Sequence, residues 1–65
     1  MITAEFFKTL QEAKTFQPCG CNGLNIYSLD KPGTVKKFRE WQDDAIANER
    51  YAEAKNARAV VVIYR

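Results

Sequence analysis

The sequence predicts one small α/β domain whose elements follow in the order α-β-α-β. A chain of 65 residues has the length of a single domain. Apolar residues recur with helical spacing in two segments, and each segment is followed by a short run rich in β-branched or aromatic residues. We therefore expect a two-layer domain, residues 1–65, with one long helix and two short strands that homodimerisation completes into a larger sheet.

The first segment, from Thr3 to about Phe16, is predicted to be a helix. Apolar residues at positions 2, 6, 10 and 13 recur at spacings of three and four, which places them on one helical face. Thr3 is a suitable N-cap. Because Pro18 disfavours helical geometry at the residue before it, this helix is expected to end near Thr15 or Phe16.

A loop over residues 18–23 follows and contains both cysteines and two of the three glycines. The simplest interpretation is a chain reversal in which Gly20 and the pair Asn22-Gly23 adopt positive φ, while the thiols are small buried apolar groups. A metal or redox role for the Cys-x-Cys pair is the alternative. Because zinc prefers four ligands, such a site needs a second copy of the chain, and we expect no metal and no cofactor in one chain.

The second half is predicted to be a strand–helix–strand unit. It has a strand over 24–29, a turn over 30–33, a long helix over about 34–56 with Thr34 as N-cap, and a strand over 59–64. Such a unit favours parallel strands joined by a right-handed crossover. A helix of about 23 residues spans roughly 35 Å, whereas a six-residue strand spans about 20 Å. The helix must therefore kink or project beyond the sheet.

We expect the chain to form a homodimer. Two short strands make a poorly stable sheet, and the last strand, which is nearly free of charge, would leave an edge open to pairing. A monomer whose first helix covers this edge is the alternative. The residues expected at the interface are Trp41, Tyr51, Val60, Val62 and Tyr64.

The composition limits the chemistry that the chain can perform. It has no histidine, which excludes Ser-His and Cys-His nucleophile pairs, and no pair of carboxylates stands out, so we expect no catalytic residue and no enzyme. A net charge of +2 is too small to indicate nucleic-acid binding. No apolar run is long enough to span a membrane, and the first residues lack the pattern of a signal peptide. We therefore expect a soluble protein of the cytoplasm.

Two functions fit these features best, ahead of nucleic-acid binding by the basic surplus of residues 32–65 and of the metal or redox role given above for the Cys-x-Cys pair. The first is a non-catalytic, homo-oligomeric interaction or inhibitor module that docks on a protein or another macromolecule. The second is sequestration of a small anionic, nucleotide-like ligand by the 20–23 loop, the first turn of the second helix and the end of the chain. The residues expected in that second site are Gly20, Asn22, Gly23, Lys36, Lys37 and Arg65.

Overall fold

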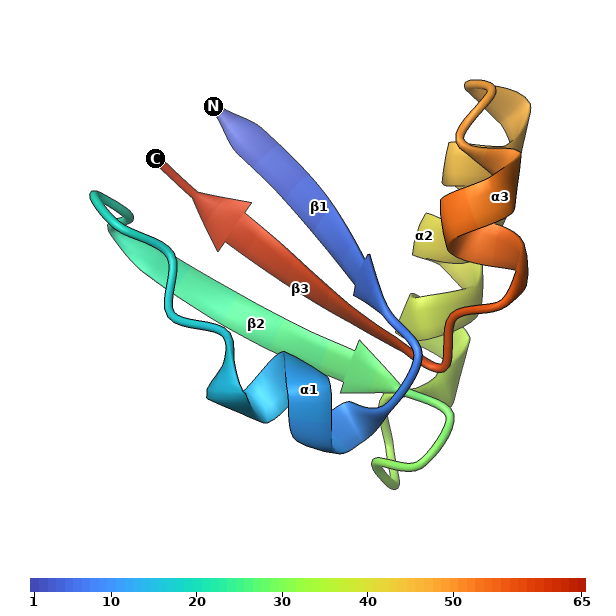
Figure 1. Cartoon of the computed structure of the whole chain (residues 1–65), viewed down its shortest axis with the longest axis horizontal. Helices are drawn as coiled ribbons and strands as arrows, with labels where there is room; N and C mark the ends of the chain where they lie inside the picture. The colour runs from blue at the N-terminus through green and yellow to red at the C-terminus, as the bar shows by residue number, and fades with distance from the viewer.

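The computed structural model describes residues 1–50 and 52–65 in full and residue 51 by its backbone alone. Six elements follow along the chain (Figure 1): β1 (Ile2–Phe7), α1 (Leu10–Thr15), β2 (Gly23–Ser28), α2 (Val35–Ala47), α3 (Tyr51–Lys55) and β3 (Ala59–Tyr64). The strands form one antiparallel sheet in the order β1-β3-β2. The chain is a small mixed α/β domain, but its order is β-α-β-α-α-β rather than α-β-α-β.

The last strand, β3, is the centre of the sheet. It pairs with β1 along one edge and with β2 along the other. Its residues from Ala59 to Ile63 are buried, and an apolar run without alternation suits a strand whose two faces are both covered. The prediction that the last strand leaves an open edge is therefore wrong.

Helices cover both faces of the sheet, so the domain has three layers and not the two that we expected. The helix α1 packs on one face, over the core residues Ala13, Ala59, Val61 and Ile63. The helices α2 and α3 pack on the other face, over the core residues Ala4, Phe38, Ala57, Val60 and Val62.

The predicted first helix is wrong in its first half, which is the strand β1. Ile2, Ala4 and Phe6 alternate with residues on the other face of the sheet, so the segment fits a period of two as well as a helical spacing. The tertiary structure decides between the two, because the buried strand β3 has backbone groups on both edges that need partners. The strand β1 supplies the hydrogen-bond partners for the second edge of β3.

Local signals mark both ends of α1. The sequence Thr9-Leu10-Gln11-Glu12 has the spacing of a capping box, and Thr9 Oγ1 accepts the N–H of Glu12 at 3.1 Å. The helix ends at Thr15, which confirms the end predicted from Pro18. A capping box was thus the sign that the helix begins at residue 10.

The predicted long helix is broken into α2 and α3. Glu49 adopts a φ of 66°, and the N–H groups of Glu49 and Arg50 bond to the carbonyls of Ile46 and Ala45 at 3.2 and 2.8 Å. This pair of bonds is the Schellman ending of a helix. Figure 1 shows that α3 then runs back beside α2, so the kink that the helix length required is confirmed.

The return of α3 sets the direction of β3. The chain enters β3 beside the end of β2, where the N–H of Leu29 bonds to the carbonyl of Arg58 at 3.0 Å. The two strands are therefore antiparallel, and the predicted parallel crossover is wrong. The strands predicted over 24–29 and 59–64 are confirmed within one residue.

Candidate functional site

The strand β1 has one edge that no strand covers. Met1 and Arg65 exchange two backbone hydrogen bonds, of 2.7 and 2.8 Å, at the start of the β1–β3 ladder. In an antiparallel ladder, pairs of this kind alternate with pairs whose N–H and C=O groups point away from the partner strand. The backbone groups of Ile2, Ala4 and Phe6 therefore point outward, away from β3.

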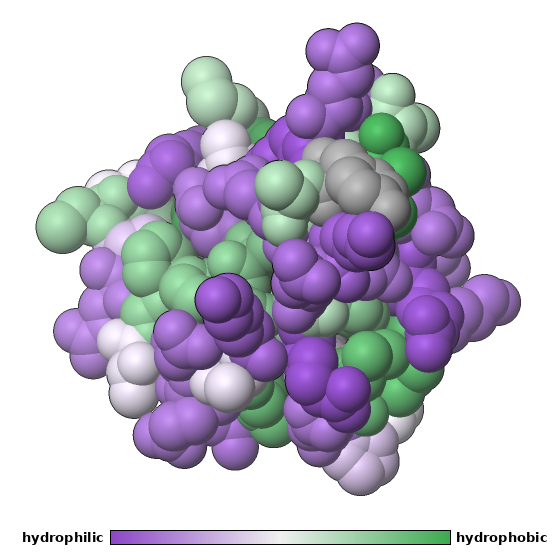
Figure 2. Space-filling model, turned by 45° about the vertical axis from the view of Figure 1, so that its right-hand side comes forward, coloured by the Kyte–Doolittle hydropathy of each residue, from purple (hydrophilic) through white to green (hydrophobic). Residues whose placement is uncertain are grey.

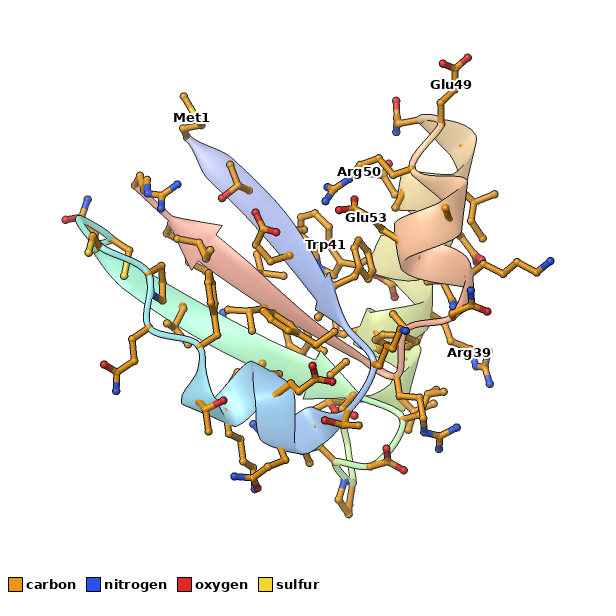
Figure 3. The ribbon with its side chains drawn as sticks, viewed as in Figure 1. Met1, Arg39, Trp41, Glu49, Arg50 and Glu53 are labelled. Carbon is orange, nitrogen blue, oxygen red and sulfur yellow. The ribbon has the colours of Figure 1, made fainter. Side chains whose placement is uncertain are left out.

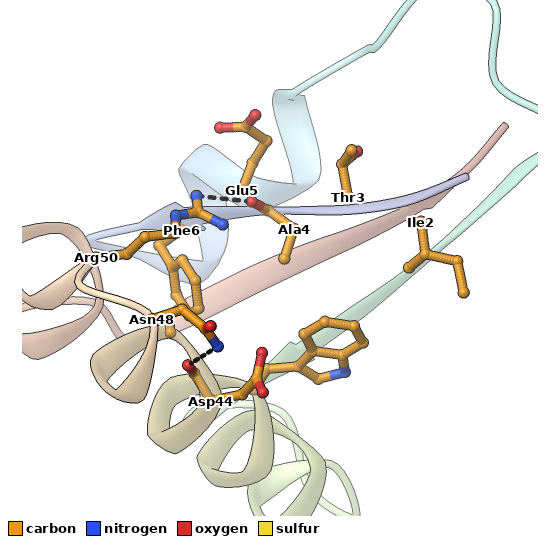
Figure 4. A pocket seen from close by; sticks show the side chains of 10 residues that line it. Ile2, Thr3, Ala4, Glu5, Phe6, Asp44, Asn48 and Arg50 are labelled. Atoms are coloured by element: carbon orange, nitrogen blue, oxygen red, sulfur yellow. Dashed lines mark hydrogen bonds between the residues drawn. The ribbon is translucent and has the colours of Figure 1, made fainter.

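A groove of about 460 Å³ runs along this edge, and we call it the β1–α2 groove. Residues 2–6 line one side, and the other side includes Trp41, Asp44 and Asn48 of α2 and its C-cap. Figure 4 shows Ile2 directed toward the helices and Glu5 directed away from them. Because neighbouring strand residues point to opposite faces, a groove that touches five in a row lies against the backbone edge itself.

Arg50 covers the Phe6 end of the β1–α2 groove. Its Nη2 donates to the outward carbonyl of Ala4 at 2.9 Å, as Figure 4 shows. Its guanidinium carbon lies 5.5 Å from the centre of the Phe6 ring, and Glu53 Oε2 lies 3.0 Å from both Nε and Nη2. A cation laid on an open strand edge protects it from unwanted pairing, and here Glu53 balances its charge.

Trp41 and Asp44 belong to the helix side of the groove. The half-buried Trp41 packs against the core beneath α2, and Figure 3 shows it between β1 and α2. Both residues also line a second hollow, of about 280 Å³, together with Lys37 and Glu40. The indole therefore forms a wall shared by two adjoining hollows.

The outer edge of β2 is covered at Ile26 and Ser28 by the chain's own polar side chains. Lys31 Nζ donates to the carbonyl of Ile26 at 3.3 Å. Thr34 Oγ1 accepts the N–H of Ser28 at 2.9 Å, so Thr34 lies before α2 as predicted but does not cap it with its side chain. The two edges of the sheet therefore differ, and the β1 edge carries the groove.

Large apolar side chains reach the surface near the open end of the groove. Figure 2 shows apolar patches set among hydrophilic side chains. Met1 and Ile2 are 84% and 56% exposed. Apolar surface beside an open strand edge is a common property of interaction sites.

The structure brings one half of the expected anion site together. Arg65 Nη2 donates to the carbonyl of Cys19 at 3.5 Å, and the N–H of Asn22 bonds to the carbonyl of Tyr64 at 2.7 Å. Arg65 thus lies beside the loop that contains Gly20, Asn22 and Gly23. The positive φ expected in this loop is found at Gly20, at 69°, and not at Asn22 or Gly23.

The other half of the expected anion site lies elsewhere. Lys36 and Lys37 are in the first turn of α2, which follows the opposite end of β2 (Figure 1). Six strand residues separate the two halves by roughly 20 Å. One chain therefore does not assemble the six residues into a single site.

The residues expected at a dimer interface have different positions. Val60 and Val62 are fully buried in the core of the chain itself, so they are not accessible to a partner. Tyr64 is half-buried, and its hydroxyl accepts a hydrogen bond from the amide of Asn25 at 3.1 Å. Trp41 lines the groove. The side chain of Tyr51 lies outside the described residues.

The two cysteines are free and differ in exposure. Cys19 is exposed, which overturns the expectation that both thiols are buried, whereas the half-buried Cys21 packs against the core beneath α1. Within residues 1–50 and 52–65, no three metal-ligating side chains of His, Cys, Asp or Glu come together.

Among the described residues, no helix has the length and hydropathy needed to cross a bilayer. Comparison with protein-family models, with curated proteins and with solved structures finds no match to this chain.

Proposed function

We propose that the chain is a non-catalytic binding module that takes up an extended segment of a partner protein as a fourth strand beside β1. The observation that carries this proposal is a groove between an open strand edge and an aromatic side chain. In strand addition, main-chain hydrogen bonds along the edge supply affinity, and contacts to alternate side chains supply specificity. The outward backbone groups of Ile2, Ala4 and Phe6 can form the main-chain hydrogen bonds. Trp41 provides a side-chain anchor of a kind common at interfaces.

An added strand takes the place of Arg50 on the carbonyl of Ala4. The lost bond involves a charged donor and is worth about 1.5–3 kcal/mol, whereas each new main-chain bond is worth about 0.5–1.5 kcal/mol. Several new bonds offset the loss, and the displaced guanidinium keeps its pairing with Glu53. Arg50 thus covers the edge when no partner is bound.

A lone segment fits this edge better than a second copy of the chain does. Two β1 strands paired about a two-fold axis perpendicular to the sheet would place both helical layers on the same face. Residues of α2 lie beside the β1 edge, across the groove from it, so two such layers would crowd the same paired edge. The predicted dimer through Val60–Tyr64 is not available either, because both edges of β3 are paired within the chain.

The test begins with a selection of random peptides, each long enough to form one strand, on the immobilised chain. Affinities of the selected peptides are then measured for variants. Ile2→Pro removes an outward N–H and leaves the β1–β3 ladder intact, while Ile2→Ala removes the side chain and keeps the N–H. Leu24→Pro is the matched control, because it makes the same change at an outward position on the other edge.

We expect Ile2→Pro to weaken binding about five- to tenfold relative to Ile2→Ala, the equivalent of one main-chain hydrogen bond. Trp41→Ala is expected to weaken it by about thirtyfold or more, and Leu24→Pro to leave it unchanged. Circular dichroism checks that each variant is folded. Failure to recover any peptide, equal binding by all variants, or a homodimer that Ile2→Pro dissociates would each contradict the proposal.

A further inference from the structure

The side chains of Trp41 and Asp44 lie next to each other on the surface of α2. They are three residues apart, so their side chains are neighbours on one helical face, and both line the β1–α2 groove and the adjoining hollow. The helical neighbours one turn before and after Asp44 are Glu40 and Asn48. Neither of them offers a positive charge to the carboxylate.

On the helix side of the two hollows, the other charges balance one another, while the carboxylate of Glu5 is directed away from the helices (Figure 4). Arg50 is paired with Glu53 at 3.0 Å, and Lys37 with Glu40 at 3.8 Å. Asp44 is exposed and makes no ion pair with any side chain that the structure describes. The carboxylate of Asp44 is therefore the surplus charge on the helix side of the groove, and it lies beside the indole of Trp41.

We infer that the β1–α2 groove selects extended segments that carry a lysine or arginine side chain, which is held between Trp41 and Asp44. This inference rests on the proposed function and names the class of segment that is bound. A cation is attracted to an indole face within about 6 Å of its centre, and the apolar stem of lysine or arginine covers aromatic surface while its charged end reaches a carboxylate.

The geometry of a strand sets the spacing of the required residues. Successive side chains of an added strand point to opposite faces, so every second one faces α2. The cation therefore occupies one position of the segment, and the residues two before and two after it face the same side. An acidic residue at the cationic position is disfavoured, because it would meet the unpaired carboxylate of Asp44.

Two peptide selections, on the wild-type chain and on Asp44→Asn, test this inference. Asp43→Asn is the matched control, because Asp43 is the adjacent exposed carboxylate and lines neither hollow. The wild-type chain and the control are expected to yield peptides with a lysine or arginine at one fixed position. Selection on Asp44→Asn is expected to lose that preference.

A double-mutant cycle then measures the contact itself. The best peptide and a version with glutamine at the cationic position are titrated against both forms of the chain at low and high salt. We expect Asp44→Asn to weaken binding of the cationic peptide about fivefold or more and to leave binding of the glutamine peptide unchanged. The effect on the cationic peptide should be smaller at high salt. Trp41→Leu, which keeps apolar contact but removes the π-face, should also reduce the preference for a cation.

The outcomes separate this inference from the proposed function. Peptides that are sensitive to Ile2→Pro, but show no preferred cation and no specific loss on Asp44→Asn, would overturn the inference and leave strand addition in place. Peptides that are insensitive to Ile2→Pro would overturn strand addition itself.

Discussion

At the level of single residues, a bidentate ion pair joins the loop after β2 to the start of β3. Arg58 Nε and Nη2 donate to the two carboxylate oxygens of Asp30 at 3.0 and 2.9 Å. The hydrogen bonds from Arg58 lower the pKa of Asp30, and the same bonds raise the pKa of Arg58. Only the Asp30 carboxyl titrates in the acid range, so it alone links this pair to the acid stability of the fold.

Replacement of Asp30 by asparagine is expected to reduce the loss of stability in acid. Because the pKa of Asp30 in the folded state lies below its ordinary value of 3.8, the pair stabilises the fold above that value. Its contribution disappears as the pH falls through the lowered pKa. The melting temperature should therefore fall further for the wild type than for Asp30→Asn between about pH 5 and pH 2.

The measurement is thermal unfolding followed by circular dichroism at a series of pH values. Asp43→Asn serves as the control, because it removes an exposed carboxylate of α2 that makes no ion pair with any side chain that the structure describes. Melting temperatures of the wild type and Asp30→Asn that fall in parallel would contradict the assigned role.

At the scale of elements, the break between α2 and α3 determines the topology of the second half. A continuous helix would carry the chain away from the end of β2, whereas the Schellman ending turns it back. The ending requires a left-handed residue, and the sequence places a glutamate there, with a φ of 66°. Glycine is the usual residue at this position, because it has no Cβ to clash in the left-handed region.

Glu49→Gly is therefore expected to stabilise the domain by about 0.5–1 kcal/mol. The gain is the left-handed strain of a residue with a Cβ, about 1–2 kcal/mol, less the extra chain entropy of glycine in the unfolded state. Ala47→Gly, in the last turn of α2, is the control and is expected to cost up to about 1 kcal/mol. Urea unfolding measures both changes, and a Glu49→Gly variant no more stable than the wild type would contradict the expectation.

At the scale of the whole molecule, one central strand holds two small cores together. Its alternate residues enter the core beneath α1 and the core beneath α2 and α3. Among the described residues, most of the buried apolar ones are alanine and valine, and Phe38 is the largest of the fully buried side chains. Phe38 therefore joins α2 to the core residues of the sheet on that face.

Phe38→Ala is expected to unfold the chain at room temperature. Truncation of a buried phenylalanine costs about 3–5 kcal/mol, and a core of this size rarely supplies more than about 3–5 kcal/mol in total. Phe38→Leu keeps most of the volume and is expected to cost less than about 1.5 kcal/mol, so it should remain folded. Circular dichroism and amide chemical-shift dispersion test both, and a cooperative thermal transition in Phe38→Ala would contradict the prediction.

The candidate site was only partly predictable from the sequence. Trp41 is identified from sequence as an interface residue because a large aromatic side chain in an amphipathic helix suggests contact. The outward backbone groups of Ile2, Ala4 and Phe6 were missed, since they depend on β1 being a strand. Asp44 was missed because two facts mark it out: it lines the groove, and no cation that the structure describes lies beside its carboxylate. Both facts depend on how β1 and α2 are placed.

The elements whose signals are local can be predicted from the order of the residues alone. The apolar run of β3, the turn before α2 and the proline after α1 act on neighbouring residues through sterics and hydrogen bonding, so they can be read in order along the chain. Three features come from the packing of the whole chain: residues 2–7 form a strand, β3 lies in the centre of the sheet, and all strand pairing is antiparallel. These features depend on which distant backbone groups meet, because a short amphipathic segment fits a helix or a strand until the unpaired edge of a buried neighbour selects one of them.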